Sequence, residues 1–136
     1  MPDVTTQFDL LLPSAPENVA RIESLVEQVK ESAGFTEEIF GNILVALTEA
    51  VNNAIIHGNK CDPSKNVEVN VTRSNHTLSF TVKDQGVGYD YRNLPDPTAP
   101  ENLEKLTGRG VFLMNQLSDM VIFSDNGSRV ELQFKI

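Results

Sequence analysis

Three polar residues recur at four-residue spacing in an otherwise apolar stretch, EAVNNAIIHGN at residues 49–59. They are Glu49, Asn53 and His57. In a helix, a rotation of about 100° per residue places them within about 80° of one another on one face. A carboxylate can orient or deprotonate a hydroxyl or a water, and an amide oxygen is a ligand that suits Mg²⁺. Taken alone, the motif is equally typical of a solvated helix face.

A second motif, KDQGVGYD, follows an alternating strand pattern and places Asp84, Gly86 and Gly88 in a D-x-G-x-G spacing. A carboxylate at the end of a strand can accept a hydrogen bond from an exocyclic amine such as adenine N6. The two glycines allow the backbone to turn and to approach a ligand closely. Taken alone, D-x-G-x-G is also typical of an ordinary turn at a strand end.

A third motif, LTGRGVFLMNQLSD, lies where a long aperiodic segment meets a predicted helix. Gly108 and Gly110 flank Arg109 there, and backbone N–H groups with the helix dipole favour an anion at such a position. Lys105 and Arg109 add positive charge. A glycine-rich loop end without a ligand is the alternative interpretation of this motif alone.

The composition limits the classes of function. A chain of 136 residues with 40% hydrophobic and 22% charged residues predicts a single domain spanning 1–136. A net charge of −8 argues against direct nucleic-acid binding and against an anionic membrane surface. An acidic domain that binds a polyanion would need local devices such as the third motif. The sequence has no run of about 18 apolar residues and no signal-peptide pattern, which predicts a cytoplasmic protein. Its one cysteine, Cys61, allows no internal disulfide.

The hydrophobic periodicity predicts the secondary structure. In chain order we expect an edge strand at 4–12, a helix with its apolar stripe at 19–33, a helix from 36 to 58, a hairpin at 67–84, a short helix beginning at 110, and two final strands joined at 126–127. Ser14 and Glu17 have capping-box spacing, Thr36 is a good N-cap, and Gly34 and Gly58 are helix-terminating glycines. The order predicts an α/β (α+β) two-layer sandwich, with helices on one face of a mixed, mostly antiparallel sheet.

The three motifs occur in one order: E-x-x-x-N on a helix, D-x-G-x-G after a strand, and G-x-G at a helix start. In this combination the chain resembles the GHKL ATP-binding superfamily, whose domains have the Bergerat fold. The stretches LTEAVNNAIIHGN, VKDQGVGYD and GRGVFLMNQLSD resemble most the stand-alone anti-sigma-factor serine/threonine-protein kinases of bacterial partner-switching systems. The resemblance covers nearly the whole chain.

The resemblance implies that the cofactors are ATP and Mg²⁺, and it assigns a role to each motif. Glu49 would be the catalytic base and Asn53 the Mg²⁺ ligand, with His57 on the same wall. Asp84 would bind adenine in a pocket shaped by Gly86 and Gly88. The phosphates would be covered by a segment that contributes Lys105, Thr107, Gly108, Arg109 and Gly110.

The function implied is phosphorylation of a serine or threonine on a STAS-type anti-anti-sigma protein, combined with sequestration of a sigma factor or similar regulator. A homodimer is possible in this branch. Two alternatives stay open: a catalytically silent ATP-binding regulator that acts only by partner binding, and a weak ATPase. The presence of Glu49 favours the kinase, because a pure binder needs no base.

Overall fold

The computed structural model describes residues 4–86 and 106–136. Five strands form one sheet in the order β1-β2-β3-β5-β4, and every pair of neighbours is antiparallel. In chain order the elements are β1 Val4–Pro13, η1 Pro16–Ala20, α1 Arg21–Ala33, α2 Glu37–Asn53, η2 Ala54–Gly58, β2 Asn66–Ser74, β3 Thr77–Lys83, α3 Leu106–Leu117, β4 Met120–Ser124, η5 Asp125–Gly127 and β5 Arg129–Lys135. The predicted α/β sandwich and the edge position of the first strand are confirmed.

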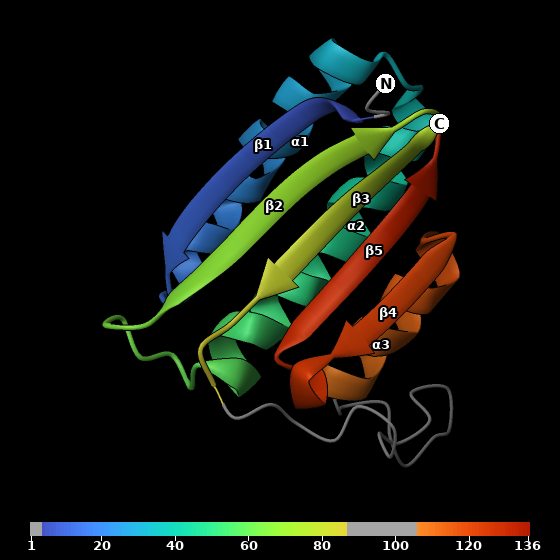
Figure 1. Ribbon diagram of the computed structural model, residues 1–136. Helices are drawn as coiled ribbons and strands as arrows, with labels where there is room; N and C mark the ends of the chain where they lie inside the picture. The colour runs from blue at the N-terminus through green and yellow to red at the C-terminus, as the bar shows by residue number, and fades with distance from the viewer. Residues whose placement is uncertain (1–3, 87–105) are drawn as a thin grey trace.

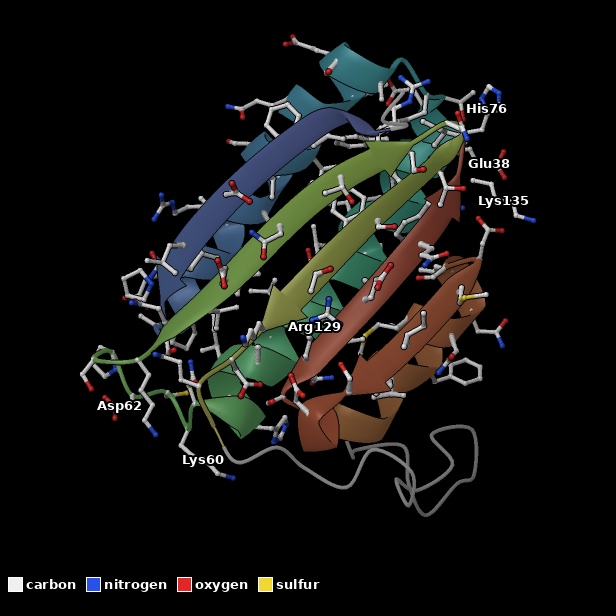
Figure 2. The ribbon with its side chains drawn as sticks, viewed as in Figure 1. Glu38, Lys60, Asp62, His76, Arg129 and Lys135 are labelled. Carbon is white, nitrogen blue, oxygen red and sulfur yellow. The ribbon has the colours of Figure 1, made fainter. Side chains whose placement is uncertain are left out.

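The three α-helices cover one face of the sheet, and no element of residues 4–86 and 106–136 covers the other, which is called the open face below (Figure 1). Alternation along the strands produces this division, because successive side chains point to opposite faces. Val67, Val69 and Val71 on β2 are buried beneath the helices. Arg129 begins β5 and lies on the open face, where polar side chains predominate (Figure 2).

Helix α2 is the central helix of the core. Ile43, Leu47, Val51 and Ile55 are fully buried, on one side of α2 and its continuation η2. Among the described residues, the stretch Glu37–Gly58 is long and apolar enough to cross a membrane, with a mean hydropathy of 1.5. This is weak evidence for a membrane span, because burial against the sheet explains the same composition.

The predicted signals between α1 and α2 are confirmed. Gly34 ends α1 in the left-handed conformation, with φ of 75°. The Thr36 hydroxyl accepts a hydrogen bond from the Ile39 N–H at 3.2 Å and caps α2. Both features follow from local chemistry: glycine carries no Cβ penalty at positive φ, and a threonine oxygen satisfies an N–H that the first turn leaves unpaired.

The predicted capping box at Ser14 is wrong. Ala15 is the N-cap of η1, and no side chain caps that helix. The Ser14 side chain is fully buried instead, and its Oγ donates to the Lys65 carbonyl oxygen at 2.8 Å. The Ser14 hydroxyl, which the local spacing predicts to cap a helix, thus binds Lys65, a residue 51 positions away in the sequence.

Gly58 does not end its helix as a left-handed C′ residue, contrary to the prediction. Helix α2 continues into a π-helical turn, η2, and the described glycines with positive φ are Gly34 and Gly127. The chain leaves the helical path at Lys60 and Cys61, with φ of 56° and 58°. Gly58 is required for a different reason, a close contact with Asp84, which is described below.

Helix α3 spans Leu106–Leu117 within the described residues, so it already includes the four residues before the predicted start at Gly110. Gly110 therefore lies beyond the first turn, whose N–H groups are the ones left free to bind an anion. Gly108 and Gly110 lower the intrinsic helix propensity of this segment. The segment is helical nevertheless, because its packing against α2 outweighs that low propensity.

Candidate functional site

Asp84 lies where β3 ends, at the same end of the molecule as the end of α2 (Figure 1). Its side chain is 6% exposed. Oδ1 accepts a hydrogen bond from the Gly86 N–H at 2.8 Å, and the Asp84 N–H donates to the Ser128 carbonyl oxygen at 2.9 Å. Burial raises the pKa of Asp84, while the Gly86 hydrogen bond and the charge of Lys65 act in the opposite direction. The result is a buried acceptor with limited hydrogen bonding.

Two glycines make room for this carboxylate. A Cβ on Gly58 would lie closer than 3.0 Å to Cγ and both oxygens of Asp84. A Cβ on Gly86 would lie closer than 3.0 Å to the carbonyl carbon and oxygen of Gly58. The end of η2 and the turn after β3 therefore touch backbone to backbone, and a larger residue at either position would push them apart.

Glu49 and Asn53 lie one turn apart on α2, and Gly110 of α3 passes directly over both. A Cβ on Gly110 would be 3.0 Å from Glu49 Oε2 and 3.2 Å from Asn53 Nδ2. Asn53 is 6% exposed, and its Nδ2 has no hydrogen-bond partner among the described residues. An unpaired buried amide is costly, and such atoms often mark the place of a ligand.

A narrow recess with a volume of about 10 Å³ connects the Asn53 and Asp84 environments. Its lining residues come from α2, η2, the end of β3 and the residue after it, α3, the β4–β5 turn and β5: Ala50, Asn53, Ala54, Val82, Asp84, Met114, Gly127, Ser128 and Val130. The recess has an apolar wall and a few convergent polar groups, as small-molecule sites do.

His57 lies in η2 and is partly buried. Burial lowers its pKa, and the positive charge of Lys60 lowers it further. A neutral imidazole is therefore favoured at neutral pH. His57 does not line the recess that Asn53 and Asp84 line. The structure therefore does not bring His57 together with these two residues.

The remaining predicted residues have less structural description. Gly88 and Lys105 lie outside the described residues. Thr107, Gly108 and Arg109 belong to the first turn of α3, and their side chains lie outside the described set. No group of three or more His, Cys, Asp or Glu side chains that could hold a metal occurs in residues 4–86 and 106–136.

Sequence reasoning missed several contributors to this site. Met114 and Ser128 line the recess, although nothing in their local sequence separates them from ordinary core and turn residues. Asn59 is fully buried, and its amide Oδ1 accepts a hydrogen bond from the Gln85 N–H at 2.7 Å. The adjacent Gly58 and Asn59 both contact the segment 84–86. Asn59 falls between the predicted helix and the predicted hairpin, where local sequence gives no sign of this contact.

The sequence of the chain is similar to those of several known proteins. The sequence model of the histidine kinase-like ATPase domain family matches residues 12–134. The chain is 31% identical to the anti-sigma F factor of Clostridium perfringens, over 98% of each chain. It is 28% identical to the serine-protein kinase RsbW of Bacillus cereus, over 91% of this chain and 81% of that protein.

A solved structure supports the fold alone. The RsbU and RsbW domains of a Mycobacterium tuberculosis protein align with a TM-score of 0.63 at 13% identity, over 96% of this chain and 32% of that one. The family match over residues 12–134 establishes that the chain belongs to the histidine kinase-like ATPase domain family.

The contact between Gly58 and Asp84 can be tested with two alanine substitutions. Gly58→Ala should destabilise the fold by about 1–3 kcal/mol, because its Cβ collides with the Asp84 carboxylate. Gly41→Ala is the matched control on α2, since a Cβ there meets nothing within 4 Å. It should stabilise the helix by about 0.5–1 kcal/mol. Urea unfolding measures both changes, and equal effects would contradict the close contact.

The raised pKa of Asp84 predicts a pH-dependent gain in stability for Asp84→Asn. The folded state binds the proton more tightly than the unfolded state, so wild-type stability falls as pH rises from about 4 through the raised pKa. Asparagine does not titrate. The stability of the variant relative to wild type should therefore increase as pH rises from about 4 through the raised pKa of Asp84.

Asp62→Asn is a control with the opposite sign. Hydrogen bonds from the Ser64 side chain and backbone lower the pKa of Asp62, on the loop beyond η2 (Figure 2). Its carboxylate thus favours folding above the unfolded pKa, so the asparagine variant should lose relative stability as pH rises to about 4, below the window in which Asp84→Asn gains it. Parallel profiles for the two variants, from urea unfolding that begins below about pH 4 and continues through the raised pKa of Asp84, would overturn the assignment at Asp84.

Proposed function

We propose that the protein is an ATP-dependent serine/threonine-protein kinase and an anti-sigma-type regulator. Its substrate would be a serine or threonine of a STAS-type protein, and it would also sequester a sigma factor or a similar regulator. One observation carries the proposal: Glu49 and Asn53 face Gly110 beside a recess that contains the buried Asp84. Relatives named as an anti-sigma factor and a serine-protein kinase support the same assignment.

Asp84 would recognise the adenine base. Its carboxylate can accept a hydrogen bond from the exocyclic N6 amine, and guanine presents a carbonyl oxygen at that position. The apolar lining from Ala54, Met114 and Val130 suits the faces of the ring. A recess of about 10 Å³ is far smaller than a purine. We therefore infer that the base enters when α3, which carries Met114, shifts away from the sheet.

Glu49 and Asn53 would act on the transferred phosphoryl group and its acceptor. Asn53 would hold Mg²⁺ together with the nucleotide phosphates, in keeping with an amide buried at that position. The metal would neutralise charge on the phosphates. Glu49 would orient or accept the proton of the incoming hydroxyl, and phosphoryl transfer depends mostly on such positioning and electrostatics.

The remaining contacts with the phosphates would come from the beginning of α3. We propose that backbone N–H groups near the beginning of α3 bind the anion. Thr107, Gly108 and Arg109 lie in this part of α3, and Gly110 would allow α3 to pass close to Glu49 and Asn53. Lys105 and Gly88 keep their proposed roles as a phosphate-contacting cation and a shaper of the adenine pocket. We assign His57 no role in the proposed reaction, because it does not line the recess.

Partner binding would use surfaces away from the recess. Glu17 and Arg21 are exposed at the start of η1 and α1, and we propose this region as a docking face. A homodimer and a cytoplasmic location belong to the same proposal. Switching between two protein partners requires that each nucleotide state differs in its affinity for them.

Asp84→Asn should weaken ATP binding by about 10- to 100-fold, the range expected for one hydrogen bond to a charged group. Asparagine keeps the shape of the side chain, but its amide group replaces one carboxylate oxygen and removes the charge. Isothermal calorimetry on the folded variant measures the affinity, with Asp62→Asn as the control. Unchanged ATP affinity in Asp84→Asn would refute the assignment of adenine to this residue.

Glu49→Ala should retain ATP binding and lower phosphoryl transfer by about 100-fold or more, as removal of a general base does. The assay follows phosphoserine formation on a STAS-type protein in the presence of ATP and Mg²⁺. Glu38→Ala is a matched control, since Glu38 lies at the opposite end of α2 (Figure 2).

The outcomes separate the candidate functions. Wild-type protein that binds ATP without phosphorylating the partner would act as a binding regulator, and release of phosphate without a partner would indicate an ATPase. Loss of ATP binding or of folding in Glu49→Ala would make Glu49 a structural residue.

A further inference from the structure

Asn59 is a buried amide for which the proposed reaction has no direct use. It is fully buried and follows Gly58 at the end of η2. Nδ2 donates to Ser14 Oγ at 2.7 Å and to the Asn66 carbonyl oxygen at 3.0 Å. Oδ1 accepts from the Gln85 N–H at 2.7 Å. The partners fix the orientation of the amide, because a backbone N–H can only donate and a carbonyl oxygen can only accept.

The bond to Gln85 lies in the middle of the turn that presents Asp84. Each of the three N–H groups in this turn is held: Asp84 by the Ser128 carbonyl oxygen, Gln85 by Asn59, and Gly86 by the Asp84 carboxylate. The partner of the Asp84 N–H is Ser128, which directly precedes β5, and the partner of the Gly86 N–H lies within the turn itself. The Asn59 bond joins the turn to the end of the helix that carries Glu49 and Asn53.

The Gln85 side chain strengthens this connection. Its Oε1 accepts a hydrogen bond from the Asn66 N–H at 2.6 Å, and Asn66 in turn supplies the carbonyl oxygen that binds Asn59 Nδ2. Gln85 is thus held through its backbone by Asn59 and through its side chain by Asn66. Next to Gln85, Gly58 and Gly86 have no side chains, which allows the end of η2 and the turn after β3 to lie in direct contact.

We propose that Asn59 is a positioning residue that sets the adenine specificity of the site by fixing the turn of residues 84–86. The inference rests on the proposed function, since it takes Asp84 as the group that reads the base. Asp84 distinguishes an exocyclic amine from a carbonyl only if its carboxylate is held in place. Asn59 supplies that constraint through a single peptide N–H and touches no part of the ligand.

Asn59→Ala removes the acceptor for the Gln85 N–H and should lower ATP affinity by about 3- to 10-fold, as expected for the loss of one ordinary hydrogen bond. The preference for ATP over GTP should fall by a similar factor, because a loose turn favours neither base. Calorimetry with both nucleotides on the full chain measures the two quantities.

Ser14→Ala is the matched control. It removes the bond between Asn59 Nδ2 and Ser14 Oγ from the same buried cluster and leaves the Gln85 contact intact. Both variants should lose stability in urea unfolding, but Ser14→Ala should change the ATP-to-GTP preference by less than about 2-fold. Equal changes in preference for the two variants, or none in Asn59→Ala, would overturn the proposal and leave Asn59 with a structural role.

A double-mutant cycle that combines Asn59→Ala with Asp84→Asn tests the role of Asn59 separately from the proposed adenine-binding role of Asp84. If Asn59 acts through Asp84, the two losses of ATP affinity should be clearly less than additive. Additive losses would contradict the positioning role. If Asp84→Asn alone leaves ATP affinity and base preference unchanged, the adenine assignment fails first. A loss in Asp84→Asn with none in Asn59→Ala refutes only the role of Asn59.

Discussion

A carboxylate held against the end of a helix is the constraint on which this structure depends most. Asp84 is almost completely buried, and burial raises its pKa. The fold tolerates such a group because Gly58 and Gly86 leave space for it and one backbone N–H binds it. Buried acceptors with few partners are costly to an isolated domain, and they become useful when a ligand supplies the missing donor. If Asp84 recognises adenine as proposed, stability and ligand recognition impose opposite demands on the same residue.

Helix α2 and its π-helical extension connect the two halves of the site. Glu49 and Asn53 face α3 across Gly110, and one turn further on Gly58 and Asn59 meet the segment that follows β3. The apolar side of the same helix covers the sheet. One rigid element thus fixes the spacing between the proposed catalytic groups and the proposed base-reading group. π-turns inside helices occur frequently at functional sites, and here the turn brings Gly58 and Asn59 against the segment after β3.

Much of the fold and part of the site could be predicted from local sequence. Strand alternation, the Thr36 cap and the Gly34 terminus are consequences of period and residue type, and each is confirmed. The predictions that failed at Ser14, at Gly58 and at the start of α3 share one cause. In each case a partner distant in sequence outweighs the local preference: Lys65 and Asn59 for Ser14, Asp84 for Gly58, and α2 for the first turns of α3.

The sequence by itself determined the elements, the one-sided placement of the helices, and the helix face that carries Glu49 and Asn53. These depend on periodicity and on chemistry within a few residues. Only the tertiary structure decided that Gly58 is a contact glycine and that Asn59 holds the Gln85 N–H. Sequence spacing does not encode such contacts, because they arise where segments more than 25 residues apart meet at one end of the sheet. Burial then decides which polar atoms must find partners inside the protein.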